Sequence, residues 1–132
     1  MKSYLIVLLA AGLFSCTSTP PQAPAEVQQM TAQTFREQNM NSKTVLVDVR
    51  TPEEFATGHL EGALNSDFRG GAFATEMQNW DKDKTYYLYC ASGNRSGKAA
   101  ELMKEAGFRN IVNVGAFQDL KEAGLPTETG NQ

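Results

Sequence analysis

The sequence predicts an α/β fold in which a small parallel β-sheet is flanked by helices on both faces. Three apolar stretches of strand length, at 44–49, 85–90 and 110–114, alternate with segments that carry helix start and stop signals. The chain has 132 residues, of which 41% are hydrophobic and 20% are charged. This length and composition are typical of one globular domain.

The domain is expected to span residues 27–126. Near its start, Thr31 is placed to cap a short helix that has Phe35 on one face. The valine-rich stretch TVLVDV, at 44–49, then predicts a buried strand.

The next segment, TPEEFATG, predicts a helix with clear ends. Thr51 stands at the N-cap and Pro52 at the first helical position. Glu53 and Glu54 occupy the first turn, where acidic side chains favour the helix, and Gly58 ends it.

The middle of the chain continues the alternation. A weaker strand is expected around 63–66, then a helix over 72–80 that the charged turn DKDK interrupts. The aromatic and apolar residues of TYYLYC, at 85–90, predict another strand.

The segment NRSGKAAELMKEAG predicts a helix that ends at Gly107. Its expected buried face comprises Ala99, Leu102, Met103 and Ala106. NIVNV, at 110–114, repeats the strand pattern, and FQDLKEAG is a last helix with a glycine stop. Residues 127–132 are expected to form a polar tail.

The charges exclude one class of function. The 12 Lys and Arg residues are scattered, and the formal net charge is -3. Because the chain lacks the basic patch typical of nucleic-acid-binding proteins, we expect no nucleic-acid partner.

Residues 1–15 have the pattern of a signal peptide, because Lys2 precedes an apolar run that is too short to span a membrane. LFSC, at 13–16, resembles a bacterial lipobox, which implies cleavage before Cys16 and a lipid on that cysteine. Residues 16–26 are expected to form a Pro-rich tether. We therefore expect a lipid-anchored protein of the bacterial cell envelope that faces the periplasm. An ordinary signal peptide and an uncleaved anchor are the alternatives.

The chain has two cysteines, and lipidation of Cys16 would leave Cys90 without an intramolecular partner. A Cys16–Cys90 disulfide is the alternative. It is disfavoured because nothing in the sequence holds Cys16, at the border of the tether, near Cys90.

Cys90 ends a predicted strand and precedes a predicted helix, which is where ligands bind in parallel sheets. In the loop CASGNR, Gly93 can adopt a positive φ, so that backbone N–H groups and the positive end of the helix form an anion-binding cradle. Arg95 adds a positive charge, and we expect Cys90 to be a nucleophile of lowered pKa. A buried, inert cysteine is the alternative interpretation.

Two stretches together, DVRTPEEFATGHLEGALN at 48–65 and CASGNRSGKAAELMKEAGF at 90–108, resemble the rhodanese-like domain family. The resemblance implies a small α/β domain whose cysteine carries a persulfide between a sulfur donor and an acceptor. Cys90 matches that cysteine. The residues that the resemblance places around the substrate are Ala91, Ser92, Gly93, Asn94, Arg95 and Ser96.

Loop length narrows what the resemblance implies. Four residues separate Cys90 from Arg95, whereas the related phosphatases and arsenate reductases have five. The shorter loop should favour a sulfur atom over a tetrahedral phosphate or arsenate. The implied activity is that of a thiosulfate-type sulfurtransferase that needs no metal or organic cofactor.

The implied partners are a small sulfur-containing anion such as thiosulfate as donor and a thiol or cyanide as acceptor. Contact with the membrane is expected through the lipid anchor only. The alternative function is a non-catalytic rhodanese-like module that binds a partner or senses oxidants, since a fold does not fix a function.

Three polar residues near these motifs are expected to be structural. His59, the single histidine, matches a turn of the family. Asp48 and Arg50 match the DVR segment of the family, and Arg50 is expected to pair with Glu53 or Glu54.

Overall fold

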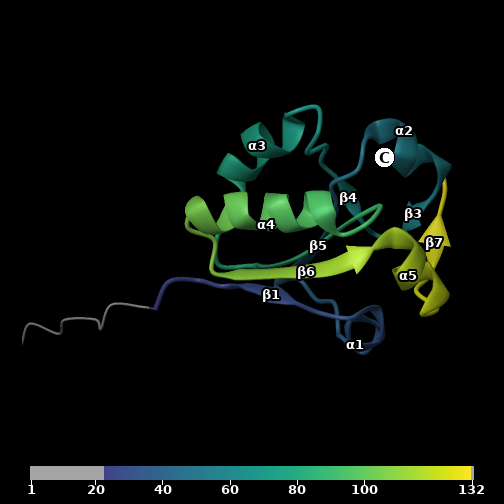
Figure 1. Cartoon of the computed structure of the whole chain (residues 1–132), viewed down its shortest axis with the longest axis horizontal. Coiled ribbons are helices and arrows are strands. Elements are labelled where there is room, and N and C mark those ends of the chain that lie inside the picture. The colour runs from purple at the N-terminus through teal and green to yellow at the C-terminus, as the bar shows by residue number, and fades with distance from the viewer. Residues whose placement is uncertain (1–22, 132) are drawn as a thin grey trace, which may run out of the picture.

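The computed structural model describes residues 23–131, and Figure 1 shows its parallel sheet with helices above and below. The strands are β1 (Val27–Gln29), β2 (Thr44–Asp48), β3 (His59–Leu60), β4 (Leu64–Asn65), β5 (Thr85–Cys90), β6 (Asn110–Ala116) and β7 (Thr127–Glu128). The helices are α1 (Ala32–Arg36), α2 (Pro52–Thr57), α3 (Ala72–Glu76), α4 (Asn94–Glu105) and α5 (Phe117–Glu122), with one 3-10 turn, η1 (Met77–Asn79).

The main sheet has five strands in the order β1-β6-β5-β2-β4, and every neighbouring pair is parallel. The predicted α/β class is therefore confirmed. Because the strands are parallel, their carboxyl ends lie at one edge of the sheet. Cys90 is the last residue of β5, a strand with neighbours on both sides, and so lies in the middle of that edge.

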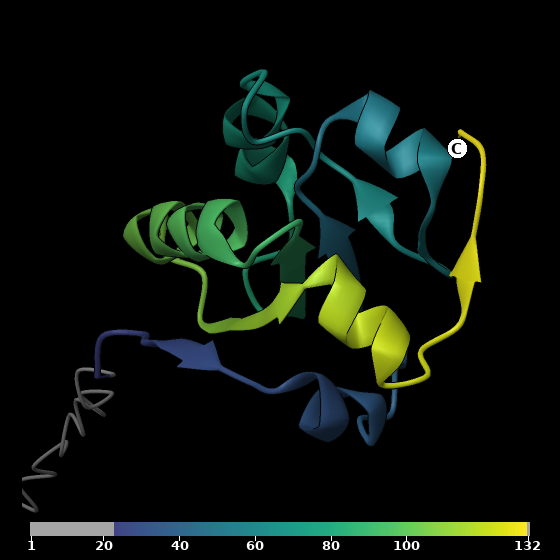
Figure 2. The ribbon, with the colours of Figure 1, turned by 45° about the vertical axis from the view of Figure 1, so that its right-hand side comes forward.

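Alternating side chains of the strands divide the interior into two cores. Leu88 and Cys90 of β5 pack in the core beneath α3 and α4. Tyr87 and Tyr89 of the same strand pack in the core formed with α1, α2 and α5. Helices thus cover both faces of the sheet, as predicted, and Figure 2 shows α4 and α5 on different sides of it.

The predicted start of α2 is confirmed in detail. The hydroxyl of Thr51 accepts a hydrogen bond from Glu54 N at 3.3 Å, and Thr51 N donates to Glu54 Oε2 at 2.9 Å. This reciprocal pair is a capping box, and Pro52 follows it in the first turn.

Three short strands, β1, β3 and β7, were not predicted from the sequence. β1 adds to the sheet beside β6, and β7 pairs antiparallel with β3, with His59 opposite Glu128. Thr127 and Glu128 were expected in a polar tail, but β7 runs along the outside of the domain in Figure 2. Strands of two or three residues are too short to show a period of two.

The predicted signal peptide, Cys16 and most of the tether lie outside the described residues. Within residues 23–131, no helix has the length and apolar character that crossing a membrane requires.

Candidate active site

Cys90 lies at the floor of the loop that joins β5 to α4. The residue is 0% exposed, whereas Ala91, Ser92 and Asn94 above it are exposed. Cys90 is a free cysteine. Its burial agrees with the interpretation as an inert cysteine. Its position at the end of β5, beneath the loop, agrees with the interpretation as a nucleophile.

The sulfur of Cys90 is surrounded by hydrogen-bond donors. Gly93 N donates to Sγ at 3.0 Å, and the hydroxyl of Ser96 lies 3.5 Å from Sγ. The first turn of α4 lies directly above, so the positive end of a 12-residue helix faces the sulfur.

These donors decide the acidity of the thiol. Burial opposes ionisation, but hydrogen bonds from the Ser96 hydroxyl and from the backbone N–H groups of Ser96, Ser92 and Gly93 outweigh it. The net result is that the pKa of Cys90 is lowered. The geometry thus favours the reactive interpretation over the inert one.

Gly93 makes this loop possible. It is the N-cap of α4 and has a φ of 87°, in the left-handed region that other residues avoid. A Cβ at this position would lie 3.3 Å from the Cα of Gly115, so the loop also packs closely on β6. The predicted positive φ of Gly93 is confirmed.

Asn113 of β6 is a site residue that the sequence analysis missed. Its Nδ2 donates to the carbonyl of Gly93 at 3.2 Å, and its Oδ1 accepts from the hydroxyl of Ser96 at 2.8 Å. The available signal was a polar residue in the otherwise apolar stretch NIVNV. A buried polar side chain of this kind needs partners, and here the partners belong to the loop.

Arg95 is held by an acidic partner from another element. Its NH1 and NH2 groups donate to Glu54 Oε2 and Oε1 at 2.7 and 2.8 Å, a bidentate pair across the start of α2. Hydrogen bonds from Arg95 lower the pKa of Glu54 to about 2. Arg95 still interacts electrostatically with Cys90, so the cradle keeps part of the positive charge that the sequence predicted.

The prediction that Arg50 pairs with Glu53 or Glu54 is wrong. Arg50 donates to Asp48 Oδ2 at 2.6 Å and to the carbonyl of Gly58 at 2.7 Å, and its guanidinium lies 4.3 Å from the ring centroid of Phe117. Both charges are buried, so each needs the other to offset its desolvation. The structural role expected for Asp48 and Arg50 remains.

His59 has the structural place that was expected of it. It is 2% exposed and stacks on Phe55 with ring centroids 3.5 Å apart. Its Nδ1 lies 2.9 Å from the carbonyl of Phe55, and its Nε2 lies 3.3 Å from Glu128 Oε1. These contacts tie α2 and β7 together and do not involve the Cys90 loop.

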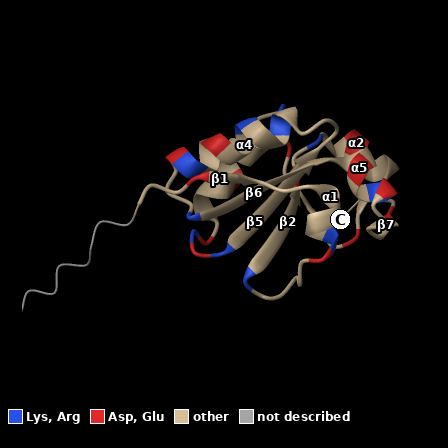
Figure 3. Cartoon of the chain, turned by 60° about the horizontal axis from the view of Figure 1, so that its bottom comes forward, with Lys and Arg blue, Asp and Glu red and all other residues tan. Residues whose placement is uncertain are grey.

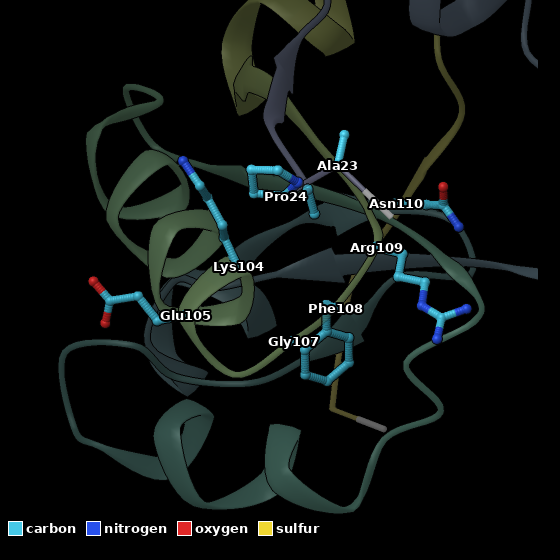
Figure 4. A pocket seen from close by; sticks show the side chains of 9 residues that line it. Ala23, Pro24, Lys104, Glu105, Gly107, Phe108, Arg109 and Asn110 are labelled. Carbon is cyan, nitrogen blue, oxygen red and sulfur yellow. The ribbon is translucent and has the colours of Figure 1, made fainter. Parts of the chain in front are cut away.

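Other features of the described residues do not compete with this site. A hollow of about 810 Å³, shown in Figure 4, is lined by Lys104, Phe108, Arg109 and others where α4 ends and β6 begins, the opposite edge of the sheet from Cys90. Within residues 23–131, no three His, Cys, Asp or Glu side chains gather as metal ligands would. Figure 3 shows acidic and basic segments interspersed on the helices and loops.

A parallel sheet with a cysteine cradle at the carboxyl end of a central strand defines a class of α/β proteins, and comparison places this chain within one family. The model of the rhodanese-like domain matches residues 31–123. The chain therefore belongs to the rhodanese-like domain family.

Particular members resemble it over much of their length. The thiosulfate sulfurtransferase PspE of Escherichia coli is 32% identical over 74 residues, which cover 56% of this chain and 71% of that protein. The thiosulfate sulfurtransferase GlpE of Pseudomonas putida is 35% identical over 85 residues, covering 64% and 76%. Among solved structures, a rhodanese from E. coli with anions is 29% identical, with a TM-score of 0.57, and covers 66% of this chain and 99% of that one.

Proposed function

We propose that this protein is a sulfurtransferase in which Cys90 takes a sulfane sulfur from a donor such as thiosulfate and passes it to a thiophilic acceptor. The observation that carries the proposal is the cradle itself, in which Gly93 N and Ser96 Oγ both reach Cys90 Sγ. The names of the related thiosulfate sulfurtransferases support the same activity.

The first half of the reaction forms the persulfide. The Cys90 thiolate attacks the outer sulfur of thiosulfate, the bond between the two donor sulfurs breaks, and sulfite leaves with the electron pair. The backbone N–H groups of the loop and the positive end of α4 stabilise the negative charge that passes through the cradle. No proton is transferred if Cys90 starts as a thiolate.

The second half returns the enzyme to its starting state. A nucleophilic acceptor, such as a thiolate or cyanide, attacks the outer sulfur of the persulfide, and the Cys90 thiolate is the leaving group. The same donors that lower the pKa of Cys90 make it a better leaving group, so one cradle serves both halves.

The burial of Cys90 adds a condition to both steps. Because the residue is 0% exposed, we propose that a donor reaches Sγ past the exposed residues above it, Ala91, Ser92 and Asn94, while Gly93 N stays at the sulfur. Arg95 is fixed to Glu54 and so anchors the far end of this loop. This pair would keep the cradle assembled as a donor enters.

The proposal extends to location. The apolar run of residues 1–15 and the LFSC sequence support a lipid on Cys16 and a position in the bacterial cell envelope, facing the periplasm. The tether of residues 16–26 would then separate the domain from the membrane surface.

A steady-state assay tests the activity. Purified protein supplied with thiosulfate and cyanide should produce thiocyanate, and Cys90→Ser should produce none. The alternative is the non-catalytic module. It would be supported if folded wild type with a free thiol made no thiocyanate, and if wild type and Cys90→Ser bound a protein partner equally well.

A further inference from the structure

Two of the groups that lie against the sulfur of Cys90 share one support. Gly93 donates to Sγ through its N–H, and its carbonyl accepts from Asn113 Nδ2 at 3.2 Å. Ser96 lies 3.5 Å from Sγ through its hydroxyl, which also donates to Asn113 Oδ1 at 2.8 Å. Two of the donors around Sγ are thus bonded to the same amide.

Asn113 is itself firmly placed. It is 7% exposed, and its Oδ1 accepts a further hydrogen bond from Gly115 N at 3.1 Å. Leu88 of β5 pairs with Asn113 whereas Tyr89 pairs with Gly115, so Val114 is an extra residue in β6 at this point. Such bulges redirect side chains next to functional sites. The bulge brings Gly115 N onto Oδ1 and so fixes the orientation of the amide, with Nδ2 toward the carbonyl of Gly93.

We propose that Asn113 is a positioning residue that holds two residues of the Cys90 cradle, Gly93 and Ser96, in place. The inference rests on the proposed function, because it takes Cys90 as the sulfur carrier. Asn113 touches neither sulfur nor substrate, and it acts only through its two neighbours in the loop.

The sign of its effect follows from Gly93, whose N–H lies 3.0 Å from Sγ, closer than the Ser96 hydroxyl at 3.5 Å. Without the amide, the carbonyl of Gly93 loses its donor. Gly93 is then free to move, which takes its N–H away from Sγ. The thiolate of Cys90 would lose a hydrogen bond, and its pKa would rise.

The test is the rate of Cys90 alkylation by iodoacetamide as a function of pH, in wild type, Asn113→Leu and Ser96→Ala. Asn113→Leu keeps a similar volume and removes both hydrogen bonds to the loop. Its apparent pKa should rise by about one unit, the scale of one hydrogen bond to a charged group. Alkylation below the pKa should slow about tenfold. If Asn113→Leu does not fold, Asn113→Val takes its place, because valine is favoured in β-strands.

Asn65→Leu is the matched control. Asn65 also lies at the carboxyl end of a sheet strand and donates to two carbonyls, of Asp48 and Arg50, but not to the loop. It should lose stability in thermal unfolding without a change in the alkylation profile. An equal pKa rise in Asn65→Leu would show general loosening and overturn the proposal.

The remaining outcomes are also decisive. An unchanged pKa in Asn113→Leu overturns the positioning role, and a lowered pKa shows that Asn113 competes with Cys90 for the Ser96 proton, which overturns it too. In the Ser96→Ala background, Asn113→Leu should still raise the pKa of Cys90, because Gly93 carries the effect. No rise in that background would overturn the role of Gly93.

Alkylation needs no sulfur donor, so this test is separate from the test of activity. If wild type forms no thiocyanate but Asn113→Leu raises the pKa of Cys90, the proposed function is wrong and the positioning role stands. If wild type is active and Asn113→Leu leaves that pKa unchanged, only the positioning role is wrong.

Discussion

At the scale of single residues, the site depends on how Cys90 can be both buried and acidic. Its sulfur has no exposed surface, which by itself would favour the thiol. Donors from Gly93, Ser92 and Ser96 reverse that preference. Burial alone would leave Cys90 an inert thiol. The hydrogen bonds to its sulfur favour the thiolate, which is the nucleophile.

The lowered pKa of Cys90 makes stability depend on pH with a definite sign. Folding favours the thiolate, so the contribution is complete above the unfolded thiol value of about 8.5 and is lost as pH falls through the folded value. Urea unfolding should show wild type gaining stability relative to Cys90→Ser as pH rises through this window. A difference that stays constant with pH would mean that the pKa of Cys90 is unchanged by folding.

The Glu54–Arg95 pair predicts a second pH effect. The pKa of Glu54 falls from 4.5 to about 2, chiefly through hydrogen bonds from Arg95, so its contribution is complete above 4.5 and is lost as pH falls toward 2. Glu54→Gln should lower the free energy of unfolding at neutral pH by about 1 kcal/mol. Urea titrations at neutral and acidic pH measure both effects.

Glu53→Gln is the control for that prediction. Glu53 is an exposed carboxylate in the same first turn of α2, so its loss changes the charge near the helix start without touching Arg95. An equal loss of stability in both variants would assign the effect to the helix terminus and not to the ion pair.

At the scale of elements, two helices begin in the same way and only one carries the site. Gly71 caps α3 with a φ of 89°, and Gly93 caps α4 with a φ of 87°. A Cβ on Gly71 would meet nothing within 4 Å, whereas one on Gly93 would lie 3.3 Å from Gly115 Cα. A substitution at Gly71 or at Gly93 therefore causes the same backbone strain, but only the substitution at Gly93 also crowds β6.

This pair of caps gives a prediction with a built-in control. Gly71→Ala should destabilise the protein by about 1–2 kcal/mol, the cost of a left-handed conformation, and leave Cys90 alkylation unchanged. Gly93→Ala should destabilise it more and slow alkylation, because the loop must move off β6 and Gly93 N moves away from Sγ. Thermal unfolding and alkylation rates measure the two effects, and slowing in both variants would contradict this account.

Elements with strong local signals were predictable from the sequence. The capping box of α2, the valine-rich β2 and the glycine that precedes α4 all carry their information within a few residues. The order of the strands and the partners of Arg95 and Asn113 depend on contacts between segments far apart in the chain. β1 and β7 are too short to show a pattern, so only the folded chain reveals them.

At the scale of the whole molecule, we propose a lipid anchor at Cys16 and a tether before the domain that carries the cradle. The proposed anchor does not depend on the fold and has its own test. Cells that express the protein and take up a fatty-acid analogue should label wild type and not Cys16→Ser. Equal labelling of both variants would contradict lipidation at this cysteine, whatever the activity of the domain.

The central claim is that Cys90 carries sulfur, and the mass of the intact protein tests it most directly. After exposure to thiosulfate, wild type should gain about 32 Da, the mass of one sulfur atom, and a reducing thiol should remove it. Cys90→Ser should gain nothing. Wild-type protein with a free thiol that shows no adduct with thiosulfate or 3-mercaptopyruvate would contradict the claim, as would an adduct that persists in Cys90→Ser.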